Sequence, residues 1–320
     1  MISLFDQIYP DKRLVSTNQL QVMLKLFQQD LMNGLVEISY SQDELVLLLL
    51  NSGMITCAYH SLGDAVVRQP LQDLSALLNS HAEGRIRICP LTPSFLRAVK
   101  TLVEQPYSTT TYPAITSTLP ALIEKNQSRS DPALLHFHWS RAEGFVFFPG
   151  NNFAPRQYAF LSEDQTSDSA AAGSMFTRWS EPALTVLEYA ADPQRDIWKE
   201  NNLQLGFSLL VEQVMRRHEE LVGHLLSRKL EDNLNRLCHT QSWNISVAGS
   251  SIDDVQLFDT LADAASAYRL ILDTMSRQVS GVIGTRLFNE TLDVGLQSLG
   301  GQLRQAIQQH DLTTSLPTPQ

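Results

Sequence analysis

The first hundred residues of the chain alternate between the apolar spacing of a helix and that of a strand. Leu20, Leu24 and Phe27 recur every three or four residues after a Ser-Thr-Asn cluster that suits a helix N-terminus, which predicts a first helix. Short apolar segments joined by tight turns follow, and they predict an antiparallel meander. The predicted order over residues 1–104 is a helix ended by Gly34, strands at 35–40, 44–50 and 54–59, a helix at 71–79, a strand at 85–89 and a helix at 93–103.

Three glycine-containing steps follow one another in this region. They are 53–58 (GMITCA) at the end of the strand pair, 63–66 (GDAV) before the second helix and 84–88 (GRIRI) in the closing strand. With these steps, residues 14–104 resemble the PATAN-type domain, which bacteria use beside receiver domains and small-GTPase regulators. The resemblance implies an α/β interaction module at 1–104 that docks such proteins and carries no catalytic residues. The GDAV step departs from the family pattern, because its alanine comes one position early and a valine stands where alanine is expected.

The middle of the chain changes character twice. Residues 105–132 are rich in Ser, Thr and Pro, which predicts a linker with one short helix at 119–125. Residues 133–196 are rich in aromatic side chains and predict a small β segment with a hairpin and a further strand at 184–190. The polar stretch 162–174 is typical of a loop. The aromatic side chains have two interpretations, a compact core or the wall of a pocket for an apolar ligand.

The remaining sequence has mainly helical spacing and predicts a bundle over residues 197–312. An apolar stripe at 203–234 predicts a single helix of roughly 35 residues. The alternation at 243–247 predicts a strand-like insertion into the bundle. A last helix at 292–307 and a frayed tail at 313–320 complete the predicted organisation.

A heptad seam forms the centre of this helical region. Apolar residues between Phe258 and Val282 step by three and four without a break, and Asp253 and Asp254 precede them as expected N-terminal caps. Such a seam either packs inside an intramolecular bundle or joins two copies as a homodimer. The residues that we expect at such a contact are Leu261, Tyr268, Leu272 and Met275.

Composition narrows the class of protein. Lys and Arg number 24 against 34 Asp and Glu, and the net charge of −10 argues against nucleic acid as a partner. The longest apolar run, 45–50, is far shorter than a bilayer span, and the N-terminus lacks the basic and apolar regions of a secretory signal, so we expect no membrane insertion. The three cysteines are far apart and predict reduced thiols in a cytoplasmic protein.

Candidate chemistry is sparse in this sequence. It contains no nucleotide-binding, metalloprotease or nucleophile-elbow motif, so we expect no catalytic residue and no cofactor. His136 and His138 share one face of a strand, a spacing that can chelate zinc, and the closest acidic residues are Asp131 and Glu143. The alternative for the two histidines is a solvated outer strand face.

These patterns together predict an α+β protein with an N-terminal α/β module, a small aromatic-rich β segment and a C-terminal helical bundle. We expect a non-enzymatic bacterial signalling or regulatory adaptor that docks protein partners, such as a receiver domain or a small-GTPase regulator, through residues 1–104. One alternative is a small-ligand sensor whose aromatic middle segment binds an apolar molecule. Another is a metal-dependent enzyme with His136 and His138 as ligands.

Overall fold

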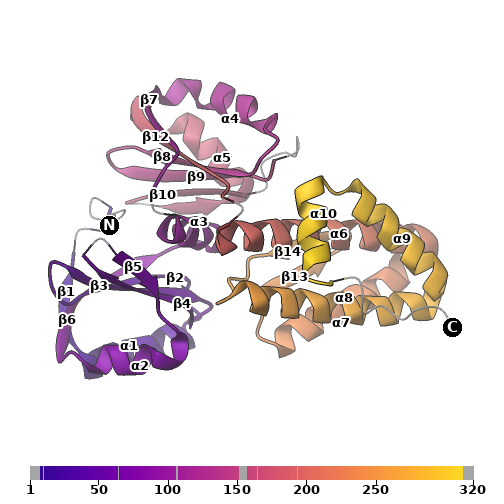
Figure 1. Ribbon diagram of the computed structural model, residues 1–320, viewed down its shortest axis with the longest axis horizontal. Helices are drawn as coiled ribbons and strands as arrows, with labels where there is room; N and C mark the ends of the chain where they lie inside the picture. The colour runs from indigo at the N-terminus through magenta and orange to yellow at the C-terminus, as the bar shows by residue number, and fades with distance from the viewer. Residues whose placement is uncertain are drawn as a thin grey trace. The chain divides into compact units, whose positions relative to one another are not determined.

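The computed structural model has an α+β fold, as predicted, in two compact units, Met1–Arg195 and Asp196–Gln320 (Figure 1). The expected frayed tail at 313–320 and Asp64 of the GDAV step lie outside the described residues. The structure describes residues 8–9, 11–63, 65–105, 107–150, 157–163, 165–192 and 194–312.

The first half of the N-terminal unit is an antiparallel sheet of six strands in the order β1-β6-β2-β3-β4-β5. Helices α1 (Thr17–Gln29) and α2 (Leu71–Asn79) pack on one face, where Leu20 and Leu74 join the core around Val36. Helix α3 (Pro93–Glu104) packs against β2 and β3. The strands are β1 (Arg13–Ser16), β2 (Gly34–Ser39), β3 (Glu44–Asn51), β4 (Met54–Leu62), β5 (Ala65–Arg68) and β6 (Glu83–Pro90).

The helices and strands predicted for this half are confirmed, and two further strands lie at the edges of its sheet. Strands β1 and β5 are four residues long and have exposed positions, so they show no clear apolar alternation in the sequence. A capping box between Ser16 and Gln19 starts α1, as the Ser-Thr-Asn cluster predicts. The GDAV step does not lead directly into a helix, because its last two residues begin β5.

The second half of the N-terminal unit is another antiparallel sheet of six strands, in the order β11-β10-β9-β8-β12-β7. Helices α4 (Leu119–Gln127) and α5 (Ser169–Arg178) pack on one face, where Leu119 and Phe176 join the core around Phe137. Helix α3 contacts β10 of this sheet as well. The strands are β7 (Thr110–Ile115), β8 (Ala133–His138), β9 (Ala142–Phe148), β10 (Gln157–Ser162), β11 (Thr166–Asp168) and β12 (Ala183–Ala190).

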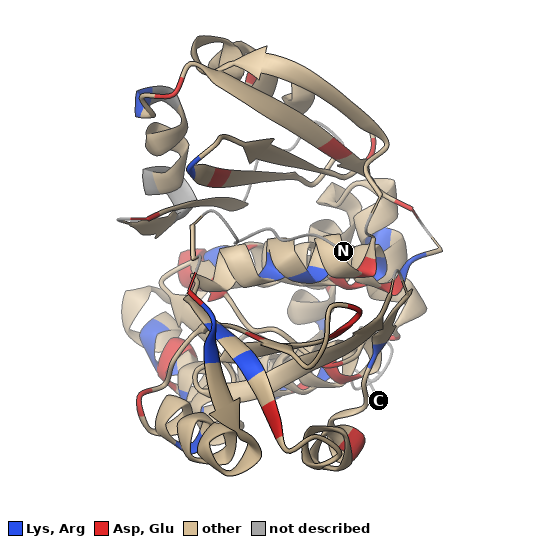
Figure 2. Cartoon of the chain, turned by 90° about the vertical axis from the view of Figure 1, so that its left-hand side faces the viewer, with Lys and Arg blue, Asp and Glu red and all other residues tan. Residues whose placement is uncertain are grey.

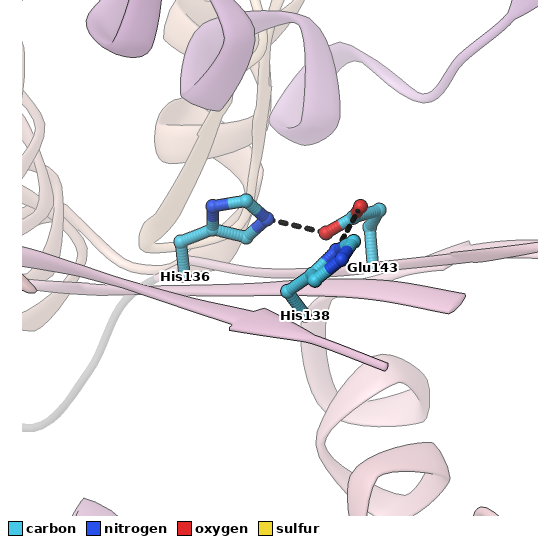
Figure 3. A group of neighbouring side chains, drawn as sticks. All are labelled: His136, His138 and Glu143. Atoms are coloured by element: carbon cyan, nitrogen blue, oxygen red, sulfur yellow. Dashed lines mark hydrogen bonds and ion pairs between the residues drawn. The ribbon is translucent and has the colours of Figure 1, made fainter. Parts of the chain in front are cut away.

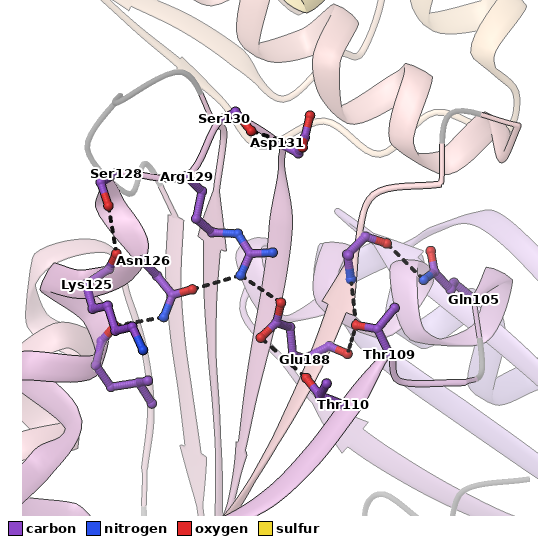
Figure 4. A network of polar contacts seen from close by, with 12 residues as sticks. Gln105, Thr109, Thr110, Lys125, Asn126, Ser128, Arg129, Ser130, Asp131 and Glu188 are labelled. Atoms are coloured by element: carbon purple, nitrogen blue, oxygen red, sulfur yellow. Dashed lines mark hydrogen bonds and ion pairs between the residues drawn. The ribbon is translucent and has the colours of Figure 1, made fainter.

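The prediction of a linker at 105–132 is wrong, because this segment supplies the edge strand β7, whereas the short helix predicted at 119–125 is confirmed as α4. A polar network ties it to β12 (Figure 4). The carboxylate of Glu188 accepts hydrogen bonds from Arg129, at 2.7 Å, and from Thr110, while Thr109 donates to the Glu188 carbonyl. The threonine side chains that suggested a linker are therefore donors at a sheet edge. The loop predicted at 162–174 is also wrong, since it contains β11 and the start of α5.

The two halves of the N-terminal unit share one topology. Each runs strand, helix, four strands, helix, strand, and the order β7-β12-β8-β9-β10-β11 repeats β1-β6-β2-β3-β4-β5 element for element. The pairing register agrees too: Gly34, which begins β2, lies opposite Pro90 at the end of β6. In the same way Ala133, which begins β8, lies opposite Ala190 at the end of β12. We call residues 13–104 the first module and residues 109–190 the second module.

A pair of threonine hydrogen bonds is repeated at the start of the first helix in each module. The Thr17 amide donates to the Ala82 carbonyl at 3.1 Å, and the Thr116 amide donates to the Pro182 carbonyl at 2.8 Å. The hydroxyl of each threonine donates to the carbonyl one residue earlier, and the second of these acceptors is Glu181. Each bond fastens the strand–helix junction to the segment before the last strand of its module.

The C-terminal unit is a helical bundle with one β-hairpin. The single long helix predicted at 203–234 is wrong: Gly223, with φ of 81°, takes the left-handed conformation that ends α6 and precedes α7. The last predicted helix is likewise divided into α9 and α10, and the strand-like insertion is confirmed as β13, paired with β14. These elements are α6 (Asp196–Val222), α7 (His224–Thr240), β13 (Ile245–Ala248), β14 (Ser251–Asp254), α8 (Leu261–Ile283), α9 (Thr285–Ser298) and α10 (Gly301–Gln309).

The heptad seam lies inside this bundle. Tyr268, Leu272 and Met275 of α8 are each 1% exposed or less. The ring of Tyr268 stacks on Phe207 of α6 at a centroid distance of 4.2 Å. The seam therefore packs intramolecularly, and the homodimer contact expected through these residues and Leu261 is not supported by their placement.

The acidic residues before the seam do not cap α8. Thr260 and Asp263 form the capping box of this helix, so the predicted role of Asp253 and Asp254 is wrong. Asp254 instead accepts a hydrogen bond of 2.7 Å from the hydroxyl of Tyr268, inside the core. A buried hydroxyl needs such a partner, which accounts for the carboxylate at this position.

The repeated topology predicts equal roles for Leu20 and Leu119, the first buried residue of the first helix in each module. We expect Leu20→Ala and Leu119→Ala each to lower the free energy of unfolding by about 2–5 kcal/mol, because each leaves a cavity in a closed core. Urea unfolding followed by circular dichroism measures both. A loss below about 1 kcal/mol for either variant contradicts the equivalence.

The buried seam predicts that Leu272→Asp unfolds the C-terminal unit, because it places an unpaired charge in an apolar core. We expect reduced helical circular dichroism and an expanded species on size-exclusion chromatography. A variant that stays helical and elutes as a smaller particle than the wild type instead indicates that the seam joins two copies.

Candidate functional sites

His136, His138 and Glu143 form a cluster on the second sheet (Figure 3). The two histidines alternate along β8, so both point to one face, and Glu143 on β9 lies directly opposite His138 in the ladder. One carboxylate oxygen of Glu143 pairs with Nε2 of His136, and the other lies 2.6 Å from Nδ1 of His138. The register of two neighbouring strands thus brings together three metal-ligating side chains.

Burial differs strongly within this cluster. The side chain of Glu143 is 2% exposed, whereas that of His138 is 43% exposed. His136 is buried and stacks on Phe145 at 4.4 Å, and its Nδ1 atom has no hydrogen-bond partner among the residues that the structure describes. The prediction of a solvated outer strand face is therefore wrong for His136. The hydrogen bond to Glu143 raises the pKa of His138, against the opposing effect of its partial burial.

The equivalent position in the first module carries an ordinary ion pair. Glu37 on β2 occupies the place that His136 occupies on β8. Its carboxylate lies 2.5 Å from Nζ of Lys12 and 3.7 Å from the guanidinium of Arg87. The first module therefore neutralises a buried carboxylate with permanent cations, whereas the second module surrounds one with imidazoles.

The first module has an apolar groove of about 930 Å³. It lies between α1 and the strands β1 and β6, and β1 is an edge strand with one unpaired side. Leu14 is 64% exposed and Val22 is 58% exposed. Large apolar side chains that stay exposed around a groove are typical of a binding surface. The segment before β1 lines it as well, and the apolar lining residues are Ile8, Leu14, Val15, Val22, Met23, Ile86 and Ile88.

The aromatic side chains of the second module fill its core. Phe137, Trp139, Phe160 and Phe176 are each 1% exposed or less and pack ring against ring at 5.3–6.2 Å. A described cavity on the opposite face of this sheet holds only about 10 Å³, which is less than a water molecule needs. Of the two interpretations of the aromatic segment, these contacts favour the compact core.

Sequence reasoning found part of these sites. It selected His136 and His138 and named Glu143 as a nearby acid, but the hairpin register that places Glu143 opposite His138 was needed to join the three. The sequence pattern does not indicate the groove, because β1 is short and Val22 and Met23 lie outside the three- and four-residue apolar spacing that predicts α1.

Comparison of the chain with protein-family models, with curated proteins and with solved structures finds no match. None of the described helices has both the length and the apolar character that crossing a membrane requires.

Glu181 holds the turn between β8 and β9, next to the cluster. Its carboxylate accepts hydrogen bonds from the amide and hydroxyl of Ser140, the amide of Arg141 and the indole of Trp179. Burial opposes ionisation, but these donors outweigh it and lower the pKa of Glu181. A carboxylate whose pKa is lower in the folded state stabilises the fold above its unfolded pKa, and this stability is lost as the pH falls through the folded pKa.

We therefore expect Glu181→Gln to lower the free energy of unfolding by about 1–3 kcal/mol at pH 7, since hydrogen bonds to a charged acceptor are weakened. The difference from the wild type should shrink as the pH falls below the ordinary glutamate value of 4.5. Urea titrations between pH 3 and about 7 measure this trend. Glu124→Gln, on the exposed side of α4, is the control and should behave as the wild type throughout.

Proposed function

We propose that the protein is a non-enzymatic signalling or regulatory adaptor that docks a protein partner in the groove between α1 and strands β1 and β6. The observation that supports this proposal is the groove itself, which keeps Leu14 and Val22 exposed. Burial of such side chains by a partner releases about 25 cal/mol per Å² of apolar surface, and apolar side chains grouped around a groove are typical of a binding surface.

The second module supplies an internal comparison for this surface. Pro113 lies opposite Thr185 as Leu14 lies opposite Arg85, and Ala121 follows Thr116 by the same interval as Val22 follows Thr17. The same fold thus forms with small or cyclic side chains at the two exposed positions. Their apolar size in the first module is not required by the fold, and a docking function accounts for it.

The charge around the groove indicates the chemistry of the partner. Basic residues lie on the neighbouring strands β1 and β6, which also has Glu83 at its start, and Asp11 lines the groove beside Arg13 (Figure 2). Arg13 lines the groove and forms no ion pair with another described residue. The same holds for Arg85 on β6. We propose a partner segment with an apolar stripe and flanking acidic residues, because such a segment complements both features. The resemblance of residues 14–104 to PATAN-type domains favours a receiver domain or a small-GTPase regulator as the source of this segment.

We place this function in the cytoplasm. The side chains of Cys57, Cys89 and Cys238 are buried, and thiols kept away from solvent suit a reducing compartment. Burial raises the pKa of the Cys238 thiol to about 11, which keeps this group protonated and unreactive at neutral pH.

The groove predicts that Val22→Asp abolishes partner binding and leaves the fold intact, because the side chain is exposed and a charge is costly in an apolar contact. The matched control is Ala121→Asp, the same charge at the equivalent exposed position of the second module. Tagged wild type and both variants are used to capture proteins from a lysate of the source organism, and captured candidates are purified for titration. We expect a partner whose affinity falls at least about 10-fold with Val22→Asp alone.

Two results contradict the proposal. One is that every partner binds the wild type and Val22→Asp equally well. The other is that both aspartate variants lose the partner to the same extent, which indicates general charge repulsion and not docking in the groove. Arg13→Glu adds a check on the partner's charge, since it should weaken binding more at low salt than at high salt.

A further inference from the structure

We propose that His136, His138 and Glu143 bind a divalent transition-metal ion, in a site separate from the docking groove. The three ligand atoms all lie within 4.8 Å of one another, and no other group of three His, Cys, Asp or Glu side chains in the described parts of the chain converges in this way. Two imidazoles and one carboxylate are a ligand set of zinc sites and of non-haem iron sites.

The chain contains a second glutamate that contacts two histidines. Comparison with it shows that a glutamate between two histidines does not always bring three ligand atoms close together. Glu44 lies 3.0 Å from His60 and 3.2 Å from His81, one histidine on each carboxylate oxygen. Glu44 thus contacts both histidines, but Glu44, His60 and His81 are not a group whose three ligand atoms all lie within 4.8 Å of one another. It serves as the matched comparison within the same chain.

Charge balance supports a cation at the convergent cluster. Glu143 is buried, and its described ion pairs are with His136 and His138 alone. A buried carboxylate is costly unless a positive charge compensates it. The first module solves this problem with Lys12 and Arg87 at the equivalent place, whereas the second module offers imidazoles, which are also metal ligands.

Access to the cluster is available from one side. His138 is 43% exposed, while His136 and Glu143 are buried and are fixed by the β8–β9 ladder and by the stacking of His136 on Phe145. Three protein ligands leave one position of a tetrahedral ion open to a fourth ligand such as water. Two ligands are thus rigid and one is adjustable.

Binding needs a small rearrangement of the adjustable ligand. Ligand atoms of a tetrahedral zinc ion lie roughly 3.4 Å apart, given bonds near 2.1 Å, whereas the Glu143 oxygen and the His138 nitrogen are 2.6 Å apart. Rotation of the half-exposed His138 opens the space on its side of the carboxylate. His136 Nε2 is also in hydrogen-bond contact with the second oxygen of Glu143, so this contact must lengthen as well when an ion enters. The proton on each coordinating nitrogen must leave: His136 then carries a proton on Nδ1, and the proton of His138 passes to the other ring nitrogen or to solvent.

The test uses the full-length protein after removal of metals with a chelator. Isothermal titration with Zn²⁺ measures affinity and stoichiometry, and Co²⁺ absorption in the visible range reports the coordination geometry. We expect one high-affinity site with tetrahedral Co²⁺ bands, and no comparable binding of Mg²⁺, which prefers oxygen ligands. His138→Gln and Glu143→Gln should each weaken Zn²⁺ binding by more than about 100-fold, since even outer-shell changes cost 10–100-fold.

Glu44→Gln is the matched control and should bind Zn²⁺ as the wild type does. Because Glu143→Gln alters a buried residue, circular dichroism accompanies each titration, and the half-exposed His138→Gln decides the result if Glu143→Gln unfolds. The proposal is overturned if the wild type binds no Zn²⁺, or if folded His138→Gln binds as tightly as the wild type. An equal loss with Glu44→Gln also overturns it, since binding is then not specific to the convergent cluster.

Discussion

Helix α3 is the element on which the arrangement of both modules depends. Each sheet packs one face against its own two helices, and its opposite face is also largely buried, so a second layer is required there. Helix α3 supplies this layer to both sheets: it contacts β2 and β3 of the first and β10 of the second. The edge of Phe95 meets the ring of Phe145 at 4.8 Å, and every residue at 95–103 is buried.

This shared helix explains why polar side chains at the inner faces are so thoroughly buried. Glu37 and His136 occupy equivalent positions on the second strand of each module's meander, on the faces that do not carry the modules' own helices. Because both side chains are buried, each needs a charged or hydrogen-bonding partner. The two modules find different partners, Arg87 in one and Glu143 in the other, so the same constraint has two chemical solutions.

Much of the fold follows from the sequence, and the failures have physical causes. The predictions succeeded where a strand or helix buries one regular stripe, as in α1 and the first meander. They failed at short edge strands such as β7, where exposed Ser and Thr side chains bond to a neighbouring strand and resemble a linker. They also failed at Gly223, because apolar spacing continues through a break that depends on a single backbone torsion.

The internal duplication could be predicted from the sequence, but only a few residues indicate it. Thr17 and Leu20 reappear as Thr116 and Leu119, roughly 100 residues later, and the strands follow at nearly the same spacing. Between these points the residues share apolar character rather than identity, because antiparallel pairing specifies which face a side chain occupies and not which side chain it is. The histidine cluster depends on the same register, so it could be suspected from spacing but not assembled without the pairing of β8 with β9.

The duplication also separates what the fold requires from what it does not. The strand order and the repeated threonine bonds are the same in both modules, so side chains that differ between equivalent positions are not required by this strand order. Two of those differences are unfavourable in themselves: exposed Leu14 and Val22 in the first module, and a buried Glu143 compensated by imidazoles in the second. The other copy has a different residue at each of these positions: Pro113 and Ala121 replace Leu14 and Val22, and Leu45, which lies opposite Ser39 as Glu143 lies opposite His138, replaces Glu143. The fold does not require these unfavourable side chains. Binding of a partner in the groove and of a metal ion at Glu143 best accounts for them, because a bound ligand stabilises the folded chain.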